Sequence, residues 1–95
     1  MPTIPLMLMM PRLGMIFVTR NAAGRVNQED AMECLERHMI GDYGEIDDVD
    51  WKTNNEAWIH GFPVVSAYSD RKKNQFLIIT DADRSATTIL LPDEY

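Results

Sequence analysis

Cys34 and His38 are a pair of residues whose side chains and spacing are suited to binding a metal ion. They stand four residues apart, which places both on one face of a helix, as two ligands of one metal ion require. A closed zinc site needs four ligands, and the chain offers one other histidine, His60, and no second cysteine. Such a site would have to borrow a carboxylate such as Asp42. The ligand count favours the alternative, a small buried thiol beside a half-exposed helix histidine.

A second cluster carries oxygen side chains at alternating positions, as the start of a calcium-binding loop does: Asp81, Asp83 and Ser85. The sixth position of such a loop requires glycine and is Ala86, and the twelfth requires a bidentate glutamate and is Pro92. The pattern therefore favours a turn in which aspartate side chains accept backbone N–H groups and Arg84 pairs with an acid. A fixed guanidinium at Arg84 could also recognise a carboxylate or phosphate.

Motifs for covalent catalysis and cofactor binding are absent from the sequence. It contains no nucleophile elbow, no glycine-rich oxyanion turn and no phosphate-binding loop, and two histidines do not make an active site. Paired carboxylates could still do acid–base work, but their spacing gives this no support. We therefore expect a protein that is not an enzyme, with no cofactor and no metal.

Charge is the strongest asymmetry along the chain. Fifteen acidic and nine basic side chains give a net charge of −6. Residues 27–56 hold ten of those acids and two bases, so this segment is strongly negative and the remainder slightly positive. Binding to nucleic acid is disfavoured because it needs a clustered positive field, and only residues 71–73 supply one.

The acidic segment has two interpretations. It is either a solvated helical face or a surface that steers a basic partner and occupies a site that normally binds DNA phosphates. Tyr43, Trp51 and Trp58 lie near these acids and could anchor an interface, although they fit the core better. The residues that we predict to contact a protein partner are Asp42, Tyr43, Glu45, Asp47, Asp48, Asp50 and Arg84.

Two helices must position these side chains. Residues 15–19 predict a strand and residues 21–24 a turn. Asn27 then fits the N-cap of a helix that stops at Gly41. Its predicted apolar stripe consists of Ala31, Met32, Leu35 and Met39. After a polar loop, a helix over about residues 49–60 begins at an N-cap on Asp47 or Asp48 and ends at Gly61 as its left-handed cap.

The rest of the chain predicts strands. Residues 62–68, 75–80 and 87–91 read as strands joined by polar turns, with 75–80 as the central strand covered on both faces. The order β-α-α-β-β-β predicts an α+β, two-layer domain in which an antiparallel meander packs against two helices.

Length and composition set the domain organisation. With 95 residues and 45% apolar side chains, the chain forms one domain, which we place at residues 13–95 after a flexible or extended arm at residues 1–12. Met9, Met10 and Met15 leave open a natural start nearer residue 13. One cysteine and no apolar run of about 20 residues favour a soluble, cytoplasmic protein in a reducing compartment.

Several strings in residues 14–95 carry a resemblance to a known family. They include Arg37-His38, the GDYG of residues 41–44, Asn55-Glu56, residues 66–68 and above all IITDADRSATTILLPDEY at residues 78–95. With these strings the chain resembles a family of small bacterial proteins found in genomes, plasmids and prophages, labelled plasmid-related protein or restriction-system methylation subunit. It departs from the family at Tyr43, where tryptophan is expected, at Asp81, where glutamate is expected, and in its methionine-rich N-terminus.

The resemblance implies no catalytic residues and suggests a protein of mobile elements. A methyltransferase would need a doubly wound sheet with a glycine-rich turn, which 95 residues in this strand order do not supply. The leading hypothesis is a non-enzymatic protein-binding module that modulates a host defence complex of the restriction or CRISPR type. The alternatives are a self-associating module that pairs through an edge strand at residues 87–91 or through the N-terminal arm, and a small-ligand or metal binder centred on His38, Asp42 and Arg84.

Overall fold

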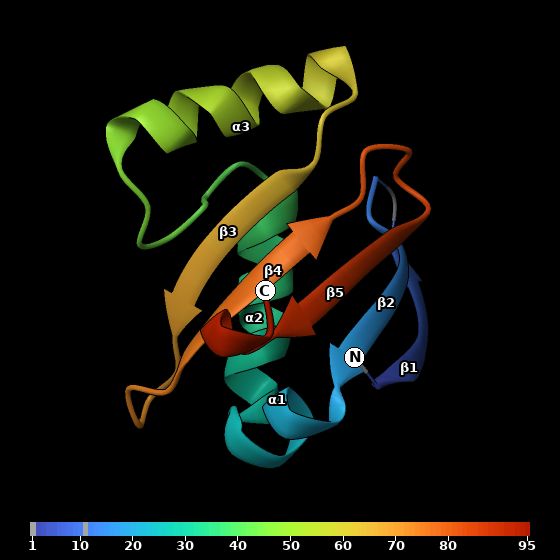
Figure 1. Ribbon diagram of the computed structural model, residues 1–95, viewed down its shortest axis with the longest axis vertical. Helices are drawn as coiled ribbons and strands as arrows, with labels where there is room; N and C mark the ends of the chain where they lie inside the picture. The colour runs from blue at the N-terminus through green and yellow to red at the C-terminus, as the bar shows by residue number, and fades with distance from the viewer. Residues whose placement is uncertain (1, 11) are drawn as a thin grey trace.

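The computed structural model describes residues 2–10 and 12–95. In chain order it has β1 (Thr3–Met10), β2 (Gly14–Thr19), α1 (Arg20–Arg25), α2 (Gln28–Met39) and α3 (Asp48–His60). The strands β3 (Val64–Ser69), β4 (Gln75–Thr80) and β5 (Ala86–Leu90) and a short 3₁₀ turn, η1 (Pro92–Glu94), complete it. The predicted α+β class and the order of its predicted elements are confirmed (Figure 1).

The five strands form one mixed sheet in the order β1-β2-β5-β4-β3. The predicted antiparallel meander is present in β3, β4 and β5, but β2 pairs parallel to β5 and β1 antiparallel to β2. The expectation that residues 87–91 form an edge is therefore wrong, because β5 is the middle strand. The strand that we predicted as central, residues 75–80, is β4, which lies next to β5. Residues 3–10 of the predicted arm form the edge strand β1.

Helix α1 replaces the turn that we predicted at residues 21–24. The Thr19 hydroxyl at the end of β2 accepts the N–H of Ala22 at 3.1 Å and so caps the helix. The same hydroxyl donates to the Glu94 carboxylate at 2.7 Å. The cap thus belongs to a strand residue that the C-terminus holds in place, which the turn-like sequence does not reveal.

Helix α2 crosses behind the sheet in Figure 1 and buries one side against it. The Asn27 side chain accepts the N–H of Asp30 at 3.0 Å, which confirms the predicted N-cap. The buried residues of the helix are Ala31, Cys34, Leu35 and His38. Met32, placed in the predicted apolar stripe, is 37% exposed, and His38, expected to be half exposed, is completely buried.

Helix α3 lies beside the outer edge of β3 (Figure 1). Its predicted caps are confirmed: Asp47 accepts the N–H of Asp50 at 2.8 Å, and Gly61 adopts a left-handed conformation with φ of 74°. The Asn54 side chain donates to the Val65 carbonyl at 2.7 Å and accepts the Val65 N–H at 3.1 Å. The helix thereby occupies hydrogen-bonding groups that an edge strand otherwise leaves open.

The sheet has one face toward the helices and one open face. On the helix side, a row of register partners runs across all five strands: Ile4, Val18, Ile89, Ile78 and Ser66. On the other side, Phe17, Thr88, Ile79 and Val65 form an equivalent row of half-buried residues. In the part of the chain that the structure describes, no helix packs on this second row (Figure 1).

Candidate functional site

The acidic residues of the segment 27–56 divide into a paired and an unpaired group. Arg37 forms two hydrogen bonds to the Asp42 carboxylate, at 2.8 and 3.2 Å, and these bonds lower the pKa of Asp42. Arg71 makes the same kind of contact with Asp30, which lowers the pKa of that carboxyl too. Asp42 therefore holds the chain that follows α2 and is not a free charge.

Among the described residues, Glu33, Glu36 and Glu56 also lie exposed on the helices without an ion pair, and four further unpaired acids gather where the loop after α2 enters α3. Glu45, Asp47, Asp48 and Asp50 are exposed. Within residues 2–10 and 12–95, none of them lies within ion-pair distance of a basic side chain. Asp47 caps α3, and Glu45 accepts a hydrogen bond from Ser69 at 3.2 Å. Their position is favourable locally because acids at a helix N-terminus interact with its dipole.

Exposed apolar side chains accompany these acids, and the sequence pattern did not identify them. Val49 lies between Asp48 and Asp50 and is 73% exposed. At the other end of the helix, Ile59 and Phe62 are 79% and 59% exposed. We define the acidic patch as Glu45, Asp47, Asp48, Val49 and Asp50. It combines negative charge with one apolar side chain.

Tyr43 is a core residue, although we predicted it as a partner contact. Its side chain is completely buried, and its hydroxyl donates to Asn55 at 2.9 Å and accepts from the Trp58 indole at 3.0 Å. Trp51 packs edge-on against its ring at 5.2 Å between centroids. Burial raises the pKa of Tyr43. The residue fixes the loop that carries the acids and does not itself reach the surface.

Arg84 lies at the opposite end of α3 from the acidic patch. Its guanidinium donates to the carbonyls of Ala57 at 2.5 Å and Phe62 at 2.7 Å and stacks on Trp58. It thus caps the C-terminus of the helix, where a cation is favourable. The expectation that it pairs with an acid is wrong, while the predicted turn is confirmed, since Asp83 accepts the N–H of Ser85 at 3.0 Å.

His38 is the centre of a buried hydrogen-bond network that the sequence did not reveal. Its Nδ1 lies 2.5 Å from the Ser66 hydroxyl and its Nε2 lies 2.8 Å from the Thr80 hydroxyl. Thr80 contacts Thr87 at 2.7 Å, and Thr87 donates to the carbonyl of Leu13 at 2.7 Å. A carbonyl can only accept, so Thr80 donates to Thr87, and His38 Nε2–H donates to Thr80. Nδ1 is then left to accept from Ser66.

This network answers the question of a Cys34–His38 metal pair. Both ring nitrogens of His38 are already bonded to hydroxyls, and burial lowers the pKa of His38 to about 4, so the ring is neutral. Cys34 is buried, and desolvation raises its pKa, which disfavours the thiolate that binds metals. Among the described residues no group of three metal-ligating side chains occurs. Nor do His38, Asp42 and Arg84 form one site, because each is bonded to a different set of partners.

The comparisons with known proteins add no relative. No family model matches the sequence, and neither the curated proteins nor the solved structures give a significant match. The family resemblance therefore rests on the sequence strings alone. Of the helices in the described ranges, none has both the length and the apolar character needed to cross a membrane.

Proposed function

We propose that this chain is a non-enzymatic protein-binding module that docks a basic partner on its acidic patch. The observation that carries the proposal is the clustering, at the start of α3, of four exposed carboxylates that have no basic partner in the described part of the chain. Unpaired charge at a helix terminus accelerates encounter with an oppositely charged surface. Val49, exposed among the acids, supplies apolar area that a solvated charged face does not need.

The kind of partner follows from the charge. A surface that binds nucleic-acid phosphates is basic, and a compact negative patch can occupy it. The resemblance to proteins of mobile elements makes a nucleic-acid-handling complex of host defence, of the restriction or CRISPR type, the partner that we propose. Docking of this chain would then compete with nucleic acid for the same surface.

The test is a pair of charge variants with equal changes in net charge. The patch variant is Asp47→Asn, Asp48→Lys and Asp50→Lys, where asparagine keeps the N-cap. The control variant is Asp93→Asn, Glu33→Lys and Glu36→Lys, three exposed positions outside the patch. Each tagged protein is incubated with host lysate, and the retained proteins are identified by mass spectrometry at moderate and high salt.

The expected result is a nucleic-acid-handling complex that the native and control proteins retain at moderate salt and lose at high salt. The patch variant should not retain it, and added DNA should displace it. Retention of the same complex by the patch variant would rule out the acidic patch as the docking surface.

Self-association is a second candidate because of the open face of the sheet. Phe17, Ile79 and Val65 are half-buried in a row that no helix of the described residues covers. A second copy packed there would bury this apolar area. Light scattering over a concentration series tests it: a rise in mass that Ile79→Lys abolishes supports a dimer, and a constant monomer mass contradicts it.

A further inference from the structure

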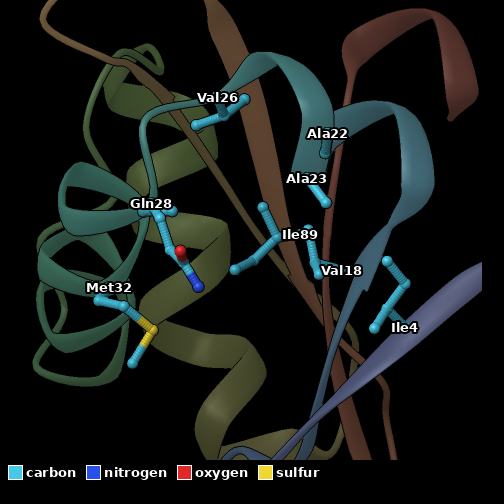
Figure 2. A pocket seen from close by; sticks show the side chains of 9 residues that line it. Ile4, Val18, Ala22, Ala23, Val26, Gln28, Met32 and Ile89 are labelled. Carbon is cyan, nitrogen blue, oxygen red and sulfur yellow. The ribbon is translucent and has the colours of Figure 1, made fainter.

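An apolar hollow lies at the opposite end of the helix-covered face from His38. Figure 2 shows it between the sheet and the helices α1 and α2. Val18 and Ile89 form its floor on the sheet, and Ala22 faces it from α1. Ala31 of α2 also lines it. All four of these residues are at least nine-tenths buried. The hollow exists because alanines stand where longer side chains would fill the space between helix and sheet.

The walls of the hollow are uncharged. Its described lining consists of eight apolar residues and one polar residue: Ile4, Val18, Ala22, Ala23, Val26, Gln28, Ala31, Met32 and Ile89. Gln28 begins α2 and is exposed, and in Figure 2 its amide extends from the helix toward the space between Met32 and Ile89. A bound molecule would thus meet apolar surface on most sides and one group that can both donate and accept a hydrogen bond.

The hollow is partly open to solvent, and its volume of about 210 Å³ is the space that the enclosed part of an occupant could fill. A dry apolar cavity of about 150 Å³ is large enough to bind benzene, whereas sites for drug-sized ligands begin at about 300 Å³. The hollow therefore accommodates a molecule somewhat larger than benzene. A charged group would be poorly accommodated, because no ion or basic side chain among the lining residues would compensate for its lost hydration.

From this geometry we propose that the hollow is a binding site for a small uncharged molecule with an apolar body and one hydroxyl or carbonyl group. The body lies against Val18 and Ile89, and the polar group bonds to the amide of Gln28. The site is separate from the acidic patch, since it lies at the first turn of α2 and the patch follows the last. Failure of one of the two proposals would therefore leave the other unaffected.

In the experiment, 1-hexanol, hexanoate and benzene are each titrated into the full chain, and binding is monitored by methyl NMR spectra. Saturable shifts of the methyl signals of Val18, Ile89 and Met32 with hexanol are expected, with affinity for hexanoate lower by about tenfold or more, a difference of about 1.4 kcal/mol. Absence of saturable shifts with hexanol overturns the proposal, as does equal binding of the anion.

Two variants and a control locate the site. Ala31→Leu fills the hollow and should abolish the shifts, while Ala82→Leu, in an exposed turn, should leave them unchanged. Gln28→Leu changes an exposed position at the mouth, so it keeps the fold even if Ala31→Leu does not. It should weaken hexanol several-fold and leave benzene unaffected. If Gln28→Leu weakens the binding of hexanol and benzene equally, or weakens neither, the proposed hydrogen bond to Gln28 is contradicted.

Discussion

The helix-covered face of the sheet has two ends that differ in their contacts: hydrogen bonds between buried polar groups at one end, and apolar side chains around a hollow at the other. At the β3 end, Asn54 bonds the backbone of Val65, and the His38 network begins at Ser66 and runs from there through β4 and β5 to Leu13. The described residues contain no buried side-chain polar atom without a partner. At the β1–β2 end, the side chains that line the hollow are apolar except for Gln28. Directional contacts fix one arrangement, whereas apolar contacts beside free volume tolerate change. We therefore expect the two ends to respond to mutation with different magnitude and sign.

The largest effect should come from adding one methyl group at the β3 end. A Cβ on Gly44 would lie 2.2 Å from the Ala67 carbonyl oxygen and 2.6 Å from the Tyr68 ring, at a φ of 74°. Gly44→Ala should lower the free energy of unfolding by at least about 3 kcal/mol, through overpacking and backbone strain together. Urea unfolding measures it.

Gly61→Ala is the matched control, because Gly61 has the same φ and its Cβ would meet no atom within 4 Å. It should cost about 1 kcal/mol from backbone strain alone. Equal losses for the two variants would mean that the loop at Gly44 is not tightly packed against β3.

The second effect is a pH dependence set by His38. Its pKa is about 4 in the folded protein, chiefly through burial and secondarily through the charge of Arg84, against 6.5 for a free histidine. Between these values the unfolded chain binds more protons, so the free energy of unfolding falls as the pH decreases from 6.5 toward 4, by about 3 kcal/mol in total. Urea unfolding at pH 7 and pH 5 should show about 2 kcal/mol of this loss. An NMR titration in which the His38 ring gains its proton above pH 6 would contradict it.

A smaller loss should follow removal of the Asn54 amide. Asn54→Ala leaves the N–H and carbonyl of Val65 without their partners, and we expect a cost of about 2 kcal/mol. Thr53→Ala serves as the control, since Thr53 is exposed and bonds only within its own helix, to the Val49 carbonyl. Similar stabilities for the two variants, measured by urea unfolding, would show that solvent replaces the amide at the β3 edge.

The smallest effect should have the opposite sign. Ala31→Leu at the hollow end adds apolar groups where space exists, and we expect the free energy of unfolding to rise by about 1 kcal/mol. Thermal unfolding compared with Ala82→Leu measures it. A destabilisation as large as that of Gly44→Ala would mean that the two ends are equally close-packed.

Local signals predicted much of the fold, because they lie next to each other in the chain. Asn27, Asp47 and Gly61 mark helix ends through bonds to residues within four positions or through their own backbone. The cap of α1 was missed because Thr19 belongs to the residues that read as a strand, although the N–H that it caps is only three residues away. The role of Arg84 was missed because its partner, the end of α3, is distant in sequence. Polar residues such as His38 and Asn54 were read as surface or left unassigned, since nothing local shows which of them the sheet will cover.

The same distinction applies to the candidate site. The acids at the start of α3 were identified from composition, since exposure is the usual state of a carboxylate. The number of charges in the segment does not predict the ion pair between Asp42 and Arg37, because that pair depends on how the chain turns after α2. The exposure of Val49 was not predictable either, since a valine inside a helix is by default assigned to the core.

The fixed direction of the His38 network has a consequence for isotope exchange. The hydroxyl protons of Ser66, Thr80 and Thr87 each have one acceptor, and the side chains that carry them are completely buried. They cannot rotate toward solvent one at a time, because each rotation would break the next bond in the series. Their replacement by deuterium therefore requires the helix α2 to separate from the sheet, and its rate reports how often the two layers part.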